Sequence, residues 1–187
     1  ETGSPTTHRD LDGKTVTTFG TFNTPGAWCS GAHGTCVAGI VAADYDTIGI
    51  IGVAPEVSLH LTDRKNTVGF TDMYDKIAQG TADASTAVAQ NNSWGYPTLD
   101  ANDFQQYVDD NPTNTIQELW ANRVSGTTST ITAYTTALNN FQNHGVVVWA
   151  NGNTPSKQSA HFLAAMPLWI PELEEAWITV ANIDITG

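Results

Sequence analysis

The stretch "VVVWA", Val146 to Ala150, is short, wholly apolar and rich in β-branched side chains. Such a run is typical of a strand that is buried on both faces of a sheet. The preceding segment, "STITAYTTALNNFQNHG" (129–145), predicts an amphipathic helix that ends at Gly145. Asn151-Gly152-Asn153 follows directly, so the sequence predicts a helix, a buried strand and a polar loop in succession.

The same alternation extends outward in both directions along the chain. Alternating or apolar runs predict further strands, and small or amphipathic stretches predict helices. This order predicts an α/β fold with a mostly parallel central sheet and helices on both faces, in a single domain over residues 1–187. The acidic stretch over residues 97–128 is interpreted as an irregular insertion. The other predicted strands are 14–23, 57–63, the end of 86–95 and 177–184, and the other predicted helices are 33–43 and 71–79, with Thr71 as the N-cap.

Charge and hydropathy exclude several kinds of partner. Seven Lys and Arg residues stand against 19 Asp and Glu residues, which gives a formal net charge of −12. Such a surface repels phosphate backbones and anionic lipids, so nucleic acid is not an expected partner. No apolar run approaches the ~18–20 residues that span a bilayer, so no membrane span is expected.

Unusual polar residues follow two of the predicted strands, where α/β proteins commonly place their chemistry. Ser93-Trp94-Gly95 comes after one strand, and Asn151-Gly152-Asn153 comes after another. His33 stands at the mouth of the predicted helix 33–43. Taken alone, His33 is either a partly buried residue that caps a helix or a general base. Taken alone, Asn153 is as well explained by a turn.

The two cysteines of the chain, Cys29 and Cys36, flank His33. They could form a disulfide in an oxidising compartment, or they could be two buried thiols, and their spacing does not decide between these states. Together with His33 they have the ligand types for zinc but supply only three ligands, and zinc is the least favoured of these readings.

Five segments in order resemble the subtilisin-like serine proteases, or subtilases. "HGTCVAGIVAA" (33–43) is similar to the histidine motif of that family, and "ETGSPTTHRDLDG" (1–13) is similar to its aspartate motif, with Glu1 where the aspartate belongs. "IIGVAPEVSLH" (50–60), "NNSWGY" (91–96) and "GVVVWANGN" (145–153) resemble three later family segments. The tail "MPLWIPELEEAWITVANID" (166–184) resembles autotransporter subtilase passenger domains of Gram-negative bacteria, which implies a secreted or cell-surface protein.

The resemblance implies a serine endopeptidase that cleaves polypeptides through an acyl-enzyme. His33 would be the general base, Glu1 would orient it, and Asn153 would donate to the oxyanion. The residues that would line the substrate cleft are Ser93, Trp94, Gly95, Ala150 and Gly152. The family also implies structural Ca²⁺, held by Asp10, Asp46 and the carbonyls of Ile48 and Ile50, and Asp46 is equally well explained as a solvent-facing acid.

One element of the family pattern does not occur in the sequence. The Gly-Thr-Ser-x-Ala type of segment that carries the nucleophile should follow Asn153, and no such segment occurs up to Gly187. The chain is therefore expected to be part of a peptidase domain that is incomplete at both ends, inactive alone, with the remainder of that domain as a partner. The alternative is a non-catalytic pseudoprotease that binds peptides.

Overall fold

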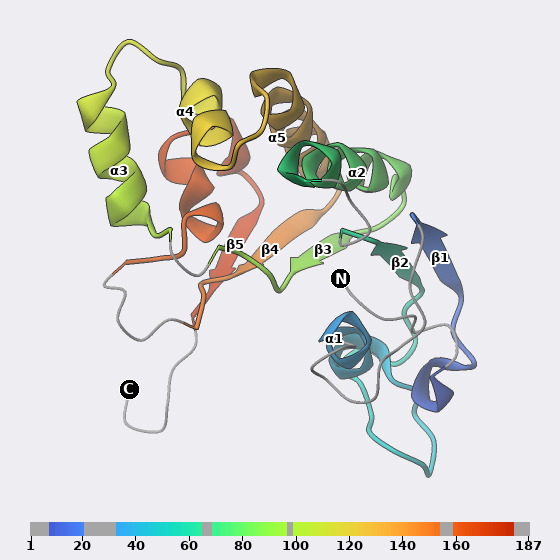
Figure 1. The fold of residues 1–187 in the computed structure, drawn as a ribbon. Helices are drawn as coiled ribbons and strands as arrows, with labels where there is room; N and C mark the ends of the chain where they lie inside the picture. Colours follow the sequence, from blue (N-terminus) through green and yellow to red (C-terminus); the bar gives the residue numbers. More distant parts are fainter. Residues whose placement is uncertain (1–7, 21–32, 65–68, 97–98, 154–158, 182–187) are drawn as a thin grey trace, which may run out of the picture. The chain divides into compact units, whose positions relative to one another are not determined.

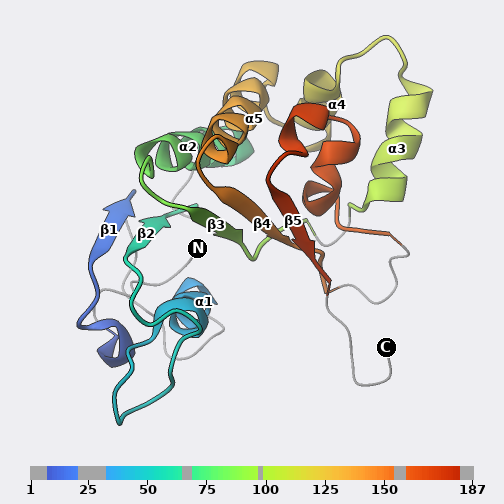
Figure 2. The same ribbon diagram turned by 180° about the vertical axis from the view of Figure 1, so that it is seen from behind.

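A computed structural model describes residues 8–20, 33–64, 69–96, 99–153 and 159–181 (Figures 1 and 2). The chain divides into two compact units, Glu1–Ala84 and Ser85–Gly187. Both units combine helices with parallel strands, which confirms the predicted α/β class.

The first unit is built on two parallel strands, β1 (Val16–Phe19) and β2 (Leu59–Thr62), with Val16 opposite Leu59. Helix α1 (His33–Ala42) follows β1, and helix α2 (Gly69–Asp83) follows β2. The buried residues of α1 are all small, so this helix packs closely against the rest of the first unit. Its core comprises Leu11 of the short 3-10 helix η2 (Arg9–Leu11), Ala38 and Ala42, with Val41 and Leu59 packed against them.

The segment after α1 folds back onto the end of that helix. The amides of Gly52, Val53 and Ala54 donate to the carbonyls of Ala43, Ile40 and Val41 at 2.8–3.0 Å. These bonds satisfy carbonyls that a helix end otherwise leaves without partners. A Cβ at Gly52 would overlap the backbone of residues 42 and 43, so this close return requires glycine.

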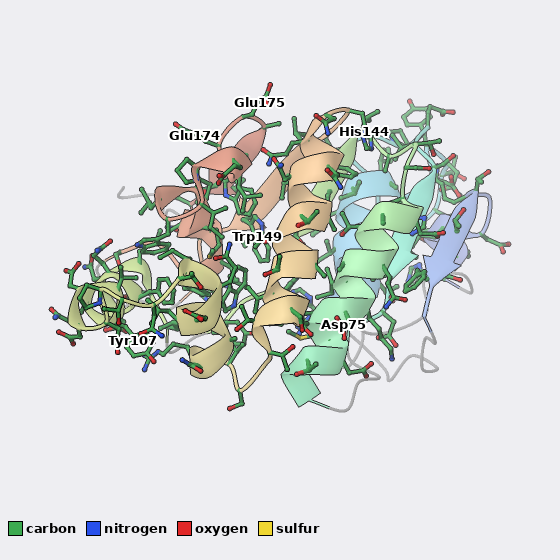
Figure 3. All side chains as sticks on the ribbon, turned by 90° about the horizontal axis from the view of Figure 1, so that it is seen from above. Asp75, Tyr107, His144, Trp149, Glu174 and Glu175 are labelled. Atoms are coloured by element: carbon green, nitrogen blue, oxygen red, sulfur yellow. The ribbon has the colours of Figure 1, made fainter. Side chains whose placement is uncertain are left out.

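The second unit contains a three-stranded parallel sheet in the order β3-β4-β5. Its helices lie on one side of this sheet, as Figures 1 and 3 show. The bounds of the elements are Ala89–Asn92 (β3), Val146–Ala150 (β4), Trp177–Val180 (β5), Ala101–Asp110 (α3), Ile116–Arg123 (α4), Thr128–Gln142 (α5), Leu163–Leu168 (3-10 helix η3) and Pro171–Leu173 (3-10 helix η4).

The covered face of this sheet is strongly aromatic. Trp149 of β4 is fully buried and stacks on Trp177 of β5, with ring centroids 5.9 Å apart. Above the sheet, Trp120 meets Tyr134 and Phe162 edge-on at 5.8 and 5.2 Å. Burial of side chains of this size is the largest source of stability in such a core.

The prediction that Val146–Ala150 is buried on both faces was wrong. Val147 and Trp149 are fully buried, whereas residues 146, 148 and 150 are only half-buried. On the neighbouring strand, Ile178 and Val180 are 48% and 52% exposed. β4 therefore buries alternate residues, as a strand with one covered face does.

The prediction of irregular structure over residues 97–128 was also wrong, because helices α3 and α4 lie there. Asp100 caps α3, where its Oδ1 accepts from the amide of Asp103 at 2.9 Å. At α4, the Thr115 hydroxyl accepts from the amide of Glu118, whose carboxylate accepts from the amide of Thr115. This reciprocal capping box lowers the pKa of Glu118. It also stabilises the start of α4, a helix in a segment of polar composition.

Two helix boundaries in the structure differ from the predicted ones. Thr71 is inside α2, which begins at Gly69, so it is not an N-cap. Helix α5 ends with Asn143 as its C-cap rather than at Gly145. Gly145 is required for a different reason, because a Cβ there would collide with the Phe141 ring.

Candidate functional site

His33 is the first residue of α1, and its side chain is exposed. The next two residues, Gly34 and Thr35, are buried. The helix is therefore anchored just behind an imidazole that faces solvent. The predicted place of His33, at the mouth of a helix, is confirmed.

Cys36 lies one turn further along α1 and is disulfide-bonded. Cys29, the other cysteine of the sequence, lies outside the described residues. A disulfide sulfur is not a thiolate, so Cys36 cannot serve as the zinc ligand considered above. Among the described residues, no group of three or more His, Cys, Asp or Glu side chains could hold a metal ion.

The loop after α1 wraps around the Asp10 carboxylate. Oδ2 of Asp10 accepts from the amide of Ile50 at 3.1 Å, and Oδ1 of Asp46 accepts from the amide of Ile48 at 2.8 Å. Gly49 between them has a φ of +74°, and a Cβ there would overlap the Asp10 carboxylate. The structure thus brings Asp10 to the loop that carries the other three predicted ligands.

The ends of β3 and β4 bring two predicted segments to the same edge of the sheet. The strands are parallel neighbours, with Asn92 opposite Trp149. Ser93, Trp94 and Gly95 leave β3 where Ala150 ends β4, and Gly152 and Asn153 follow immediately. Six of the predicted site residues therefore lie on two adjacent segments.

Trp94 is held by contacts at this edge. Its Nε1 donates to Oδ1 of Asn92 at 3.3 Å, and its ring lies 5.0 Å from that of Trp149, inclined by 59°. Asn92 is only 3% exposed. Residues of β3 and β4 therefore hold the Trp94 ring in place.

The loop that carries Asn153 is held on both sides through Asn151. The Asn151 amide donates to the Val180 carbonyl at 2.9 Å, and the Asn151 carbonyl accepts from the His161 amide at 3.0 Å. Gly152 has a φ of +101°, a backbone conformation that favours glycine. The backbone is thus held in place at Asn151, two residues before the exposed Asn153.

His161 belongs to this region and was not singled out from the sequence. It is 7% exposed and contacts both segments of the sheet edge. Burial lowers the pKa of His161, while the Tyr96 carbonyl and the Asp100 carboxylate act in the opposite direction. No local motif in "QSAHFL" marks this histidine, and only its contacts in the fold reveal it.

The sequence comparisons agree with this fold. Residues 1–186 match the model of the subtilase family. The chain belongs to the subtilase family. It is also 39% identical over 83 residues to subtilisin DY of Bacillus licheniformis. That match spans 43% of this chain and 28% of subtilisin DY.

Membership of the subtilase family supports a function of the serine-protease type. Within this subtilase chain, His33 belongs to the first compact unit and Asn153 belongs to the second. Glu1 lies outside the described residues. Within the part of the chain that the structure describes, no helix has the length and apolar character needed to cross a membrane.

Proposed function

We propose that the protein acts as a serine endopeptidase that cleaves polypeptides through an acyl-enzyme. The observation that carries this proposal is the shared sheet edge, where Ser93–Gly95 and Ala150–Asn153 follow parallel neighbouring strands in a member of the subtilase family. Because the chain matches only 28% of subtilisin DY, the proposal concerns the full-length protein that contains it.

His33 is the proposed general base. A neutral imidazole takes the proton of the attacking hydroxyl and later gives it to the leaving amine. The exposed position of His33 at the start of α1 leaves its ring accessible to such a partner. Glu1 is the proposed carboxylate that orients the ring, and the nucleophilic serine would come from the remainder of the peptidase domain.

The sheet edge in the second unit is proposed to bind the substrate. Residues 93–95 would lie along the peptide backbone, with Ala150 and Gly152 opposite, and the Trp94 ring and the small Ala150 side chain favour apolar or aromatic substrate residues. Asn153 would donate its side-chain amide to the oxyanion of the tetrahedral intermediate. A donor fixed in advance is effective because it does not reorganise during the reaction.

Asn153→Ala tests this assignment in the full-length protein. We expect kcat for a peptide substrate to fall about 10²–10³-fold with KM little changed, a range known for the oxyanion asparagine of a subtilisin. Asn139→Ala is the matched control, because that exposed amide lies on α5 away from the sheet edge. Equal activities of the two variants would remove Asn153 from the mechanism.

We also propose that Asp10, Asp46 and the carbonyls of Ile48 and Ile50 hold a structural Ca²⁺. All of these donors are oxygen atoms, which Ca²⁺ prefers. The contacts of Asp10 and Asp46 with the backbone of the 46–50 loop support the fit. The ion would neutralise the two carboxylates and fix the loop that follows α1.

Calcium removal should therefore destabilise the protein. Ligand at 100 times its Kd stabilises a folded state by about 2.7 kcal/mol. For a chain of this size, we expect chelation to lower Tm by roughly 2–4 °C for each kcal/mol lost. Asp10→Asn should abolish the calcium-dependent part of Tm, whereas Asp12→Asn, an exposed neighbouring acid, should keep it. An unchanged wild-type Tm after chelation would exclude this ion.

We propose a secreted or cell-surface location, as expected for an autotransporter passenger. The disulfide of Cys36 supports it, because disulfides persist mainly in oxidising compartments. In fractionated cells of the source organism, Cys36 should react with a thiol reagent only after reduction, and the protein should appear outside the cytoplasm. Cytoplasmic protein with a freely reactive Cys36 would contradict the proposal.

A further inference from the structure

His161 joins the two segments that the proposed function uses. It precedes η3 and forms an antiparallel bridge with Asp100, close to the ends of both β3 and β4. It is 65 residues away from Tyr96 in sequence, yet its Nε2 makes a hydrogen bond with the Tyr96 carbonyl. A buried polar side chain with such partners fixes the positions of the groups that it joins.

The ring fills the space directly behind the peptide-binding segment. A Cβ at Gly95 would collide with the His161 ring. The Tyr96 ring is stacked on the imidazole, with centroids 6.3 Å apart and planes inclined by 19°. Gly95 and Tyr96 therefore both pack against the His161 ring, Gly95 through its backbone and Tyr96 through its carbonyl and its ring.

The backbone of His161 holds the second segment. Its amide donates to the Asn151 carbonyl at 3.0 Å, and its Cβ lies where a side chain of Gly152 would be in ordinary contact, at 3.4 Å. This residue thus touches the loop immediately before Asn153 and the segment that ends at Tyr96. One residue therefore joins the two walls of the proposed cleft, with its ring against Gly95 and Tyr96 and its backbone bonded to Asn151.

The hydrogen-bond partners fix the tautomer of His161. The Leu163 amide can only donate, and it donates to Nδ1 at 3.2 Å, so Nδ1 carries no proton. Nε2 then carries the proton and donates it to the Tyr96 carbonyl. The tautomer thus follows from the chemistry of the two hydrogen-bond partners.

Protonation of His161 would disrupt this arrangement. A proton on Nδ1 would face the Leu163 amide and remove that hydrogen bond. Among the described residues, the titratable groups that the structure brings to the ring are Asp100 and Tyr96, and Asp100 favours the charged ring. Burial outweighs it and keeps the pKa of His161 below the ordinary 6.5. The stability that His161 contributes is therefore fully present above about pH 6.5 and is lost as pH falls through its folded-state pKa.

We propose that neutral His161 is a positioning residue that holds Gly95–Tyr96 and Asn151–Gly152 at a fixed spacing for peptide binding, and that its protonation loosens this spacing. The inference rests on the proposed function, because it assigns the two segments to one peptide cleft. His161 itself is not assigned any contact with the reacting atoms.

The first test compares His161→Phe and His161→Gln in the full-length protein. Phenylalanine keeps a ring without nitrogen, so we expect kcat/KM to fall about tenfold or more, mainly through KM. Glutamine can still donate to the Tyr96 carbonyl and does not titrate. It should restore most of the activity, and it should abolish the rise of KM that we expect for the wild-type protein at acid pH. His144→Gln, at an exposed histidine after α5, should resemble the wild type.

Two results would overturn the inference. One is a His161→Phe variant with wild-type KM, and the other is an acid-side rise of KM that persists in His161→Gln. Thermal unfolding of each variant identifies loss of fold, and His161→Gln remains decisive if His161→Phe does not fold. The fall of kcat at acid pH that is caused by the general base, His33, should persist in every variant. This persistence distinguishes the titration of His33 from that of His161.

The second test needs no activity. In the full-length protein with labelled histidine, ring nitrogen resonances should report a proton on Nε2 and none on Nδ1. On titration, the amide signals of Tyr96, Gly152 and Leu163 should move with the midpoint of His161, which should lie below 6.5. A proton on Nδ1, or amides that do not follow His161, would refute the inference. A protein that cleaves no peptide but passes this test would refute the proposed function alone.

Discussion

His33→Ala should lower kcat for peptide cleavage by the full-length protein about 10⁶-fold. That magnitude is the loss known for a subtilisin deprived of its catalytic histidine. Without an imidazole, the serine hydroxyl has no group to accept its proton, and the leaving amine has no acid. The measurement is single-turnover cleavage of a chromogenic peptide together with labelling by a sulfonyl fluoride. Labelling should be lost together with cleavage.

The fold should survive this change, because the His33 side chain is exposed and the buried face of α1 lies beyond it. The matched control is His144→Ala, another exposed histidine, which should keep full activity. A His33→Ala variant as active as the wild type would refute the protease mechanism. A wild-type protein that binds peptides at the sheet edge but cleaves none would instead support the pseudoprotease alternative.

Phe162→Ala should destabilise the second unit by about 3–5 kcal/mol, the usual cost of removing a buried aromatic side chain. Phe162 is fully buried at the centre of the aromatic layer. Its ring lies 4.3 Å from that of Phe104, 5.2 Å from that of Trp120 and 5.9 Å from that of Trp169. The alanine variant would leave a cavity shared by these three rings. Denaturant unfolding followed by tryptophan fluorescence measures the loss.

Leu168→Ala is the matched control for Phe162→Ala. Leu168 lies on η3, six residues further along the chain, and is 72% exposed. Its truncation should change the free energy of unfolding by no more than about 0.5 kcal/mol, as is usual for surface positions. Comparable losses for the two variants would mean that the aromatic layer is not the core of this unit.

The sequence predicted those parts of the fold that local patterns encode. The apolar run at 146–150 and the run beginning at Trp177 are strands, and the small-residue run from His33 is a helix. The parallel pairing of β3 with β4 followed from the alternation of helices and strands. The sheet edge that carries residues 93–95 and 150–153 could therefore be anticipated.

The remaining features depend on contacts that the local sequence does not encode. Helices α3 and α4 were missed because their composition is polar, although Thr115 and Glu118 form a capping box that the sequence displays. The half-burial of Val148 reflects what covers the sheet rather than the strand's own composition. His161 was missed because its partners lie up to 65 residues away.

The close approach of Gly95 to the His161 ring has an evolutionary consequence. The space that a side chain at position 95 would need is already filled by the imidazole. Among homologues, these two positions should therefore covary, with larger residues at 95 accompanied by smaller ones at 161. A reconstructed ancestor or a grafted cleft would have to exchange both positions together.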